Sequence, residues 1–185
     1  KVVEKLRKEG LAVSLDILGE EVLSDKEAAQ YANKYLDLIK FLTLQLNSWP
    51  GIDLLDTDDK GPIPRLDISL KVSSFYSQLD PIDWEGAVEN AKNALTPIVE
   101  AAQKNGVSLT LDMEHYYLKD LTISIFKRIL EENADFHFGG IVIQTYLKDS
   151  KKDLLDILDW AKRAEKAVLI RLVKGAYWDY ETIVN

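Results

Sequence analysis

The chain has 185 residues, of which 46% are hydrophobic, 31 are acidic and 23 are basic, so its formal net charge is −8. This length suffices for one domain with a sizeable core. The acidic balance argues against a nucleic-acid-binding segment and a polybasic membrane anchor, because both depend on lysine and arginine. The lack of cysteine excludes disulfides, cysteine-ligated zinc, iron–sulfur clusters and thiol chemistry.

Strand-like runs alternate with amphipathic helical stretches along the chain. A charged, helix-like stretch over 1–10 comes first, and an apolar run over 11–18 predicts a buried strand. Ser24 and Glu27 have the spacing of a capping box, which predicts a helix continuing to Leu42. The polar segment 47–64, rich in Asp, Gly and Pro, predicts a long loop.

The same alternation continues through the middle of the chain. Strict alternation of polar and apolar residues over 65–71 predicts a second strand, and 107–113 repeats this pattern as a third. Between them, Asp83 has the position of an N-cap and Gly106 that of a glycine ending a helix.

The last third predicts a helix, a strand, a second helix and a fifth strand. These elements cover 118–130, 138–147, the stretch from Ser150 to Ala161, and 167–173. Strands that alternate with crossover helices predict an α/β fold with a parallel sheet covered by helices.

Polar or ionisable side chains occur near the carboxyl end of every predicted strand. They are Asp16 and Glu20, Lys71, Asp112 and Glu114, Gln144 and Tyr146, and Arg171 and Lys174. In parallel α/β folds these strand ends meet on one side, where ligands bind. Their recurrence predicts a functional site on that side.

Each of these residues also has a structural interpretation. Asp16 could cap the next helix, Lys71 could extend into solvent, and Gln144 could form hydrogen bonds within a buried strand. Arg171 is harder to explain in this way. A strand flanked by helices is buried on both faces, and a buried charge needs a partner or an anionic ligand.

The common sequence motifs for binding nucleotides or metals and for a catalytic nucleophile are missing from the sequence. It contains no Rossmann or Walker phosphate loop and no nucleophile elbow, and His115 and His137 lack metal-ligand spacing. Asp112 and Glu114 are weak grounds for a cation site. The cationic residues Lys71, Arg171 and Lys174 suit an anionic substrate or a cofactor that contains a diphosphate.

The string Arg171-Leu-Val-Lys-Gly-Ala-Tyr-Trp-Asp179 closely resembles the signature of the proline dehydrogenase family, FAD-dependent enzymes of proline catabolism. Its Trp-Asp pair is most similar to the bifunctional bacterial branch, proline utilization A. Four other segments agree with the family in the same order: Ser14–Glu20, Ile68–Lys71, Leu111–Glu114 and Ile143–Lys148.

The resemblance implies a distorted (β/α)8 barrel of the TIM type, with residues 1–185 as its N-terminal part of about five strands. Because no initiator Met precedes Lys1 and the chain stops soon after the signature, we expect it to be cut from a longer protein. The rest of the barrel, the paired arginines that clamp the proline carboxylate, and an aldehyde dehydrogenase domain are expected outside it. This segment alone is therefore not expected to be active.

The implied reaction is oxidation of L-proline to Δ1-pyrroline-5-carboxylate, with hydride passing to flavin N5 and electrons passing on to a quinone. The implied location is cytoplasmic and allows peripheral contact with the inner membrane. The expected catalytic residues are Lys71, which pairs with the substrate carboxylate, Asp112 and Arg171. The expected FAD-binding residues are Met113, Gln144, Arg171, Val173, Lys174, Gly175, Ala176 and Trp178; no metal ligand is expected.

Two alternatives stay open from the sequence. A related FAD barrel could oxidise another cyclic amino acid such as hydroxyproline, because specificity depends on residues outside this chain. A non-catalytic barrel fragment could serve as an interaction module, although an unused site has no need for a charge such as that of Arg171.

Overall fold

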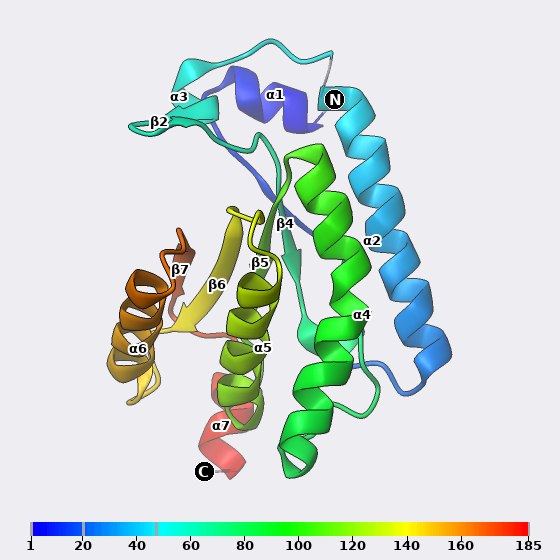
Figure 1. Ribbon diagram of the computed structural model, residues 1–185, viewed down its shortest axis with the longest axis vertical. Helices are drawn as coiled ribbons and strands as arrows, with labels where there is room; N and C mark the ends of the chain where they lie inside the picture. Colours follow the sequence, from blue (N-terminus) through cyan, green and yellow to red (C-terminus); the bar gives the residue numbers. More distant parts are fainter. Residues whose placement is uncertain (1, 20, 47, 185) are drawn as a thin grey trace.

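The computed structural model, which describes residues 2–19, 21–46 and 48–184, contains a five-stranded parallel sheet (Figure 1). The order in the sheet is β1-β4-β5-β6-β7. The strands are β1 Ser14–Asp16, β4 Asp67–Leu70, β5 Ser108–Leu111, β6 Gly139–Gln144 and β7 Leu169–Val173. Glu20, predicted near the carboxyl end of the first strand, and Asn47 of the predicted loop lie outside the described residues.

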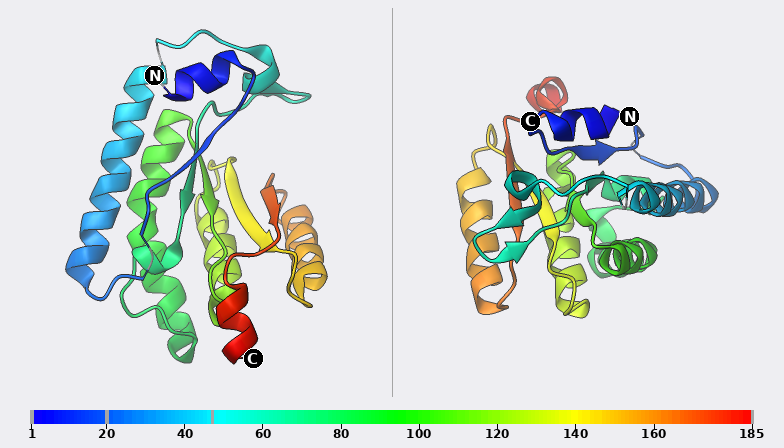
Figure 2. Two further views of the ribbon diagram at one scale, coloured as in Figure 1. Left: turned by 180° about the vertical axis from the view of Figure 1, so that it is seen from behind. Right: turned by 90° about the horizontal axis from the view of Figure 1, so that it is seen from above.

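Four long helices stand side by side along one face of the sheet (Figures 1 and 2). They are α2 Asp25–Leu46, α4 Trp84–Asn105, α5 Lys119–Glu132 and α6 Ser150–Arg163. Each connects two neighbouring parallel strands, as the alternating sequence pattern predicts. Seen from above, the sheet is curved and these helices surround its outer side (Figure 2).

The smaller elements lie at the two ends of the strands (Figure 1). At the amino end are α1 Val2–Lys8, α3 Asp53–Asp56 and the antiparallel pair β2 Thr57–Asp58 and β3 Gly61–Pro62. At the carboxyl end, α7 Trp178–Val184 follows β7. Three short 3₁₀ turns complete the structure: η1 Val72–Ser74, η2 Pro81–Asp83 and η3 Tyr116–Leu118.

The predicted helix ends are confirmed by their hydrogen bonds. The N–H of Glu27 donates to Ser24 Oγ at 3.3 Å, and the Glu27 carboxylate accepts from the N–H of Leu23 at 2.9 Å. Asp83 Oδ1 accepts from the N–H of Gly86 at 3.2 Å, which caps α4. Gly106 ends α4 in the left-handed region, with φ at +62°.

The strand alternation separates a hydrophobic face from a polar face. Residues at alternate positions of β4, β5 and β6 are buried against the helices; they are Ile68, Leu70, Leu109, Leu111, Ile141 and Ile143. The positions between them carry polar residues such as Asp67, Ser69 and Thr110, and these face the inner side of the curved sheet. The inner face of the curved sheet is therefore the polar surface on which the candidate site lies.

A buried ion pair holds α1 to the segment around α3 at the amino end. Arg7 Nη2 lies 2.7 Å from Asp56 Oδ1, and Arg65 Nε lies 3.1 Å from Asp56 Oδ2. The N–H of Ile52 also donates to this carboxylate at 2.9 Å. Burial favours the neutral acid, but these donors and charges outweigh it and lower the pKa of Asp56.

Several sequence predictions are wrong in detail. The first strand spans only Ser14–Asp16 and is not buried, because it is an outer strand of the sheet. β7 is the other outer strand, so the Arg171 side chain is 36% exposed instead of buried on both faces. The predicted loop over 47–64 contains α3 and the small β2–β3 pair, and the sequence analysis did not predict α7.

Within the part of the chain that the structure describes, no helix combines the length and apolar character that a membrane span needs.

Candidate functional site

Charged side chains form a network on the inner face of the sheet, near the carboxyl ends of the strands. Lys71 Nζ lies 2.7 Å from Asp16 Oδ2 and 3.5 Å from Asp112 Oδ2. Arg171 Nη2 lies 3.2 Å from Asp112 Oδ1. Asp112 therefore stands between two cations from different strands.

The strand register explains why these residues meet. In a parallel sheet, paired residues point to the same face. Ser69 of β4 pairs with Asp16 of β1 on one side and with Thr110 of β5 on the other. Lys71 and Asp112 follow Ser69 and Thr110 by two positions, so their side chains reach the same inner face.

Ser69 also belongs to this network, although it is not among the site residues predicted from the sequence. Its hydroxyl donates to Asp112 Oδ1 at 2.9 Å and accepts a hydrogen bond from Arg171 Nη2. The sequence does contain a signal for Ser69: Asp67, Ser69 and Lys71 occupy alternate positions of one predicted strand and therefore share a face. Only the curvature of the sheet brings β7 close enough for Arg171 to reach β4.

The network keeps Lys71 in its charged form. Burial opposes the charge, but the hydrogen bond and charge of Asp16 and the charge of Asp112 outweigh it and raise the pKa of Lys71. The Tyr35 hydroxyl supports the network from α2: it donates to Asp16 Oδ1 at 3.4 Å and to the Ser69 carbonyl at 3.2 Å. Burial and the charge of Asp16 raise the pKa of Tyr35, so it stays a neutral donor.

Arg171 has hydrogen-bonding capacity left for a ligand. Its bonds to Ser69 and Asp112 use only Nη2. Among the described residues, Nη1 and Nε have no partner, and the side chain is partly exposed. A guanidinium with free N–H groups suits carboxylate, phosphate or ring carbonyl oxygens.

Gln144 joins two loops at the carboxyl end of the sheet. Its Nε2 donates to the Glu114 carbonyl at 2.8 Å, and its Oε1 accepts from the N–H of Ala176 at 3.2 Å. The side chain is 2% exposed. Gln144 thus ties the segment after β7 to the segment after β5, and one amide N–H keeps no partner in the described part of the chain.

Gly175 is required where this segment passes Tyr146. Its φ is +139°, and an added Cβ would lie 1.7 Å from Tyr146 Cε1. Only glycine adopts this conformation readily and leaves the necessary space. The backbone of residues 174–176 is consequently held close to the end of β6.

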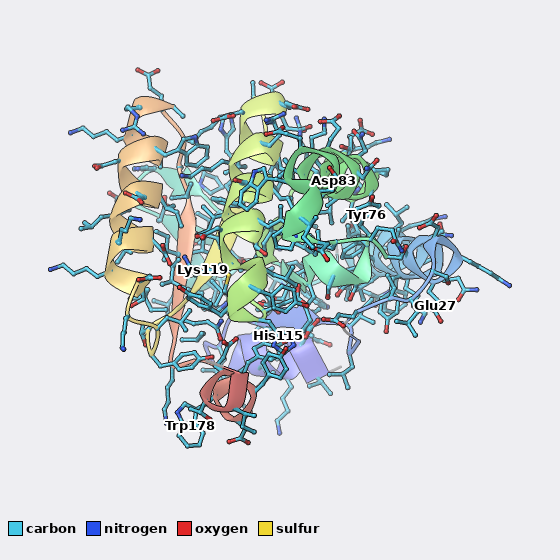
Figure 3. All side chains as sticks on the ribbon, turned by 90° about the horizontal axis from the view of Figure 1, so that it is seen from below. Glu27, Tyr76, Asp83, His115, Lys119 and Trp178 are labelled. Atoms are coloured by element: carbon cyan, nitrogen blue, oxygen red, sulfur yellow. The ribbon has the colours of Figure 1, made fainter. Side chains whose placement is uncertain are left out.

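The remaining predicted residues lie outside the charged network. Met113 is buried in the hydrophobic core, because it alternates with the inward-facing Asp112. Lys174 and Ala176 are exposed, and Val173 is half-buried. Trp178 is 60% exposed and lies on the outer side of α7 (Figure 3). The flavin contacts expected of these residues stay predictions.

The carboxylates near the site do not form a metal centre in the described ranges. Glu114 is buried and accepts hydrogen bonds from the N–H and the hydroxyl of Ser73. No group of three or more His, Cys, Asp or Glu side chains that could hold a metal ion occurs in residues 2–19, 21–46 and 48–184.

The donors of the site fit a flavin nucleotide. A flavin ring presents carbonyl and nitrogen acceptors, and its diphosphate carries negative charge. Matching donors and charge would come from the N–H groups of Arg171 and Gln144 that have no partner among the described residues, and from the exposed residue Lys174.

A family model described as "Proline dehydrogenase" matches residues 1–185. Proline dehydrogenase 1 of Bacillus subtilis is 32% identical over 178 residues, which cover 96% of this chain and 48% of that protein. The bifunctional protein PutA of Salmonella typhimurium is 26% identical over 179 residues, or 96% of this chain and 13% of that protein. The chain thus spans about half of the first relative and a small part of the second.

Solved structures show the same fold. Proline utilization A of Bdellovibrio bacteriovorus, inactivated by N-propargylglycine, has a TM-score of 0.95 and 38% identity over 99% of this chain and 19% of that chain. Proline utilization A of Corynebacterium freiburgense has a TM-score of 0.79 and 31% identity over 99% of this chain and 18% of that chain. The first likeness confirms the prediction of a partial (β/α)8 barrel.

Proposed function

Because the chain belongs to the proline dehydrogenase family, we propose that it forms the N-terminal part of a barrel that oxidises L-proline to Δ1-pyrroline-5-carboxylate with FAD. The observation that carries the proposal is the network of Lys71, Asp112 and Arg171 at the carboxyl ends of the strands. This is the side of parallel α/β folds on which ligands bind. The remainder of the barrel comes from residues outside this chain.

Lys71 is suited to hold the substrate carboxylate. Its ammonium has three donors, of which Asp16 and Asp112 engage two, and its raised pKa keeps it charged at neutral pH. Proline must react as the free amine. A permanently charged lysine binds the carboxylate without supplying a proton to the ring nitrogen.

Arg171 and the segment after β7 are suited to hold the flavin. When bound, FAD supplies the hydride acceptor of the reaction. Arg171 keeps N–H groups that have no partner among the described residues, and these would favour negative charge on a bound ring. Asp112 fixes the guanidinium from one side, and Gln144 fixes the 174–176 backbone from the other.

The wider setting of the reaction belongs to the same proposal. Electrons pass from the flavin to a quinone, and in a bifunctional protein an aldehyde dehydrogenase domain takes the product onward. The proposed location is the cytoplasm, which allows peripheral contact with the inner membrane. The similarity to bifunctional PutA supports a second domain.

The test uses the purified full-length protein. We expect a visible flavin absorption band that bleaches when L-proline is added without oxygen, and that returns when a quinone is supplied. Bleaching by hydroxyproline but not by proline would favour the related cyclic amino acid as substrate. A folded, colourless protein that takes up no added FAD would favour an interaction module.

A further inference from the structure

His115 lies at the centre of a cluster of tyrosines at the carboxyl end of the sheet. The centroid of its ring lies 4.2 Å from that of Tyr177, 4.5 Å from that of Tyr180 and 5.7 Å from that of Tyr117. Tyr117 stacks with an interplanar angle of 14°, and the other two rings are tilted by 54° and 55°. Tilted and offset arrangements at such distances are favourable for aromatic pairs.

The cluster connects segments that are distant in the sequence. His115 follows Asp112 by three residues, whereas Tyr177 directly follows the segment 174–176 beside Gln144. Figure 3 shows His115 between the start of α5 and α7. Tyr117 extends the connection to the loop after β1, because its hydroxyl donates to Glu21 Oε1 at 3.0 Å.

The described side chains of α7 are mostly exposed. Over residues 178–183, Glu181 is the one buried side chain, and no apolar side chain is buried. Glu181 Oε1 accepts from the N–H of Tyr116 at 2.6 Å, beside His115. The ring contacts of His115 with Tyr177 and Tyr180 therefore add aromatic packing at a helix that buries no apolar side chain over 178–183.

His115 contributes here through aromatic packing and not through a hydrogen bond of its Nδ1 atom. Its Nδ1 is buried and has no hydrogen-bond partner among the described residues. A buried polar atom without a partner is unfavourable, so the gain at this position comes from the flat ring between tyrosines. A phenyl ring at this position would keep that packing.

We propose that His115 is a positioning residue that fixes Tyr177, and through it the segment 174–177, against the loop that follows Asp112. The part of this inference that concerns flavin rests on the proposed function. This role requires no contact between His115 and substrate or cofactor. It acts by ordering the backbone that Lys174, Gly175 and Ala176 present beside Arg171.

The experiment compares His115→Ala, His115→Phe and the matched control His137→Ala in the full-length protein. His137 is exposed and lies just before the amino end of β6, whereas the cluster lies at the carboxyl end of the sheet. Hydrogen exchange is followed for peptides covering 174–184, in the flavin-free and the FAD-loaded protein. FAD affinity is measured by titrating the flavin-free protein.

In His115→Ala we expect exchange over 174–184 to be about tenfold faster in both forms, and the Kd for FAD to rise by a similar factor, because two tilted ring pairs are lost. His115→Phe restores both values, and His137→Ala changes neither. Unchanged exchange in His115→Ala, or no rescue by His115→Phe, would overturn the inference. Faster exchange with unchanged FAD affinity would overturn its flavin part. A wild-type protein that binds no flavin would instead contradict the proposed function, while the exchange data still decide on His115.

Discussion

Arg171 of β7 reaches Asp112, the residue that follows β5, at 3.2 Å, although β6 lies between β5 and β7 in the sheet. The contact is possible because the sheet curves and the arginine side chain is long. Asp112 also faces Lys71, the residue that follows β4, so one carboxylate organises two cations that come from different strands. Our predictions for activity follow from this arrangement.

Replacing Lys71 by alanine should affect the substrate more than the cofactor. We expect Lys71→Ala to raise the KM for L-proline about 10- to 100-fold, the usual effect of losing a hydrogen bond to a charged group. Flavin content should stay at the wild-type level, because Arg171 keeps Asp112 and Ser69. Steady-state kinetics and the flavin-to-protein absorbance ratio measure both. Lys60→Ala, at the exposed β2–β3 pair, is the control, and equal loss of flavin and substrate binding in Lys71→Ala would contradict the assigned role.

Replacing Arg171 by methionine should affect the flavin first. The free N–H groups of its guanidinium disappear, so we expect FAD affinity to fall about 10- to 100-fold and the flavin reduction potential to shift to lower values. Arg171→Lys should recover only part of this effect, because an ammonium cannot reproduce the planar fork. Titration with FAD and potentiometry measure the changes. Unaltered affinity, potential and turnover in Arg171→Met would show that the site is wrongly assigned.

Gly175→Ala should be more harmful than another glycine substitution at positive φ. Gly61 has φ at +130° and no heavy atom within 4 Å of an added Cβ, whereas at Gly175 the Cβ meets Tyr146. Both variants carry a backbone cost of roughly 1–3 kcal/mol. Only Gly175→Ala should also lower FAD occupancy, because the 174–176 segment must move. Thermal unfolding and flavin content compare the two, and equal behaviour of both variants would argue against close contact with Tyr146.

Asp56→Ala should destabilise the amino end without touching the site. Arg7, 3% exposed, would be left as a buried charge without its carboxylate, which costs about 3–5 kcal/mol. The free energy of unfolding from denaturant titration should fall accordingly, with FAD affinity unchanged. Asp59→Ala removes an exposed carboxylate of the same segment and should have little effect. A loss of stability no larger than that of the control would show that the ion pair contributes little.

The same pair predicts a dependence of stability on acid. The pKa of Asp56 is lower in the folded protein than its usual value. Its stabilising contribution is therefore complete above the unfolded pKa of about 3.9 and is lost as the pH falls through the folded pKa. The stability difference between wild type and Asp56→Asn should be constant from neutral pH to about pH 5 and should shrink below pH 4. A difference that stays constant on acidification would contradict this prediction.

The element order could be predicted from the sequence because hydrophobic periods and caps are local. Asp83, Gly106 and the pair Ser24 and Glu27 mark helix ends in the sequence, and they have these roles in the structure. The exposure of Arg171 could not be predicted in this way. Burial of a strand depends on its neighbours in space, and β7 is an outer strand among the described residues.

The sequence predicts which strand ends carry the site residues, but not which of these residues contact one another. The alternation placed Lys71 and Asp112 on one face, yet the contact of Arg171 with Ser69 depends on the curvature of the sheet. α7 was missed because its described residues bury no apolar stripe. α7 is held partly by the ring contact of Tyr180 with His115 and by the hydrogen bond from the Tyr116 N–H to Glu181. Neither contact leaves a periodic hydrophobic pattern in the sequence.

The two outer strands have a practical consequence. β1 pairs only with β4 and β7 only with β6 in the described residues, so each presents a row of backbone N–H and C=O groups along its free side. Such rows readily recruit strands from other molecules. Residues 1–185 produced by themselves would consequently tend to self-associate along β1 and β7.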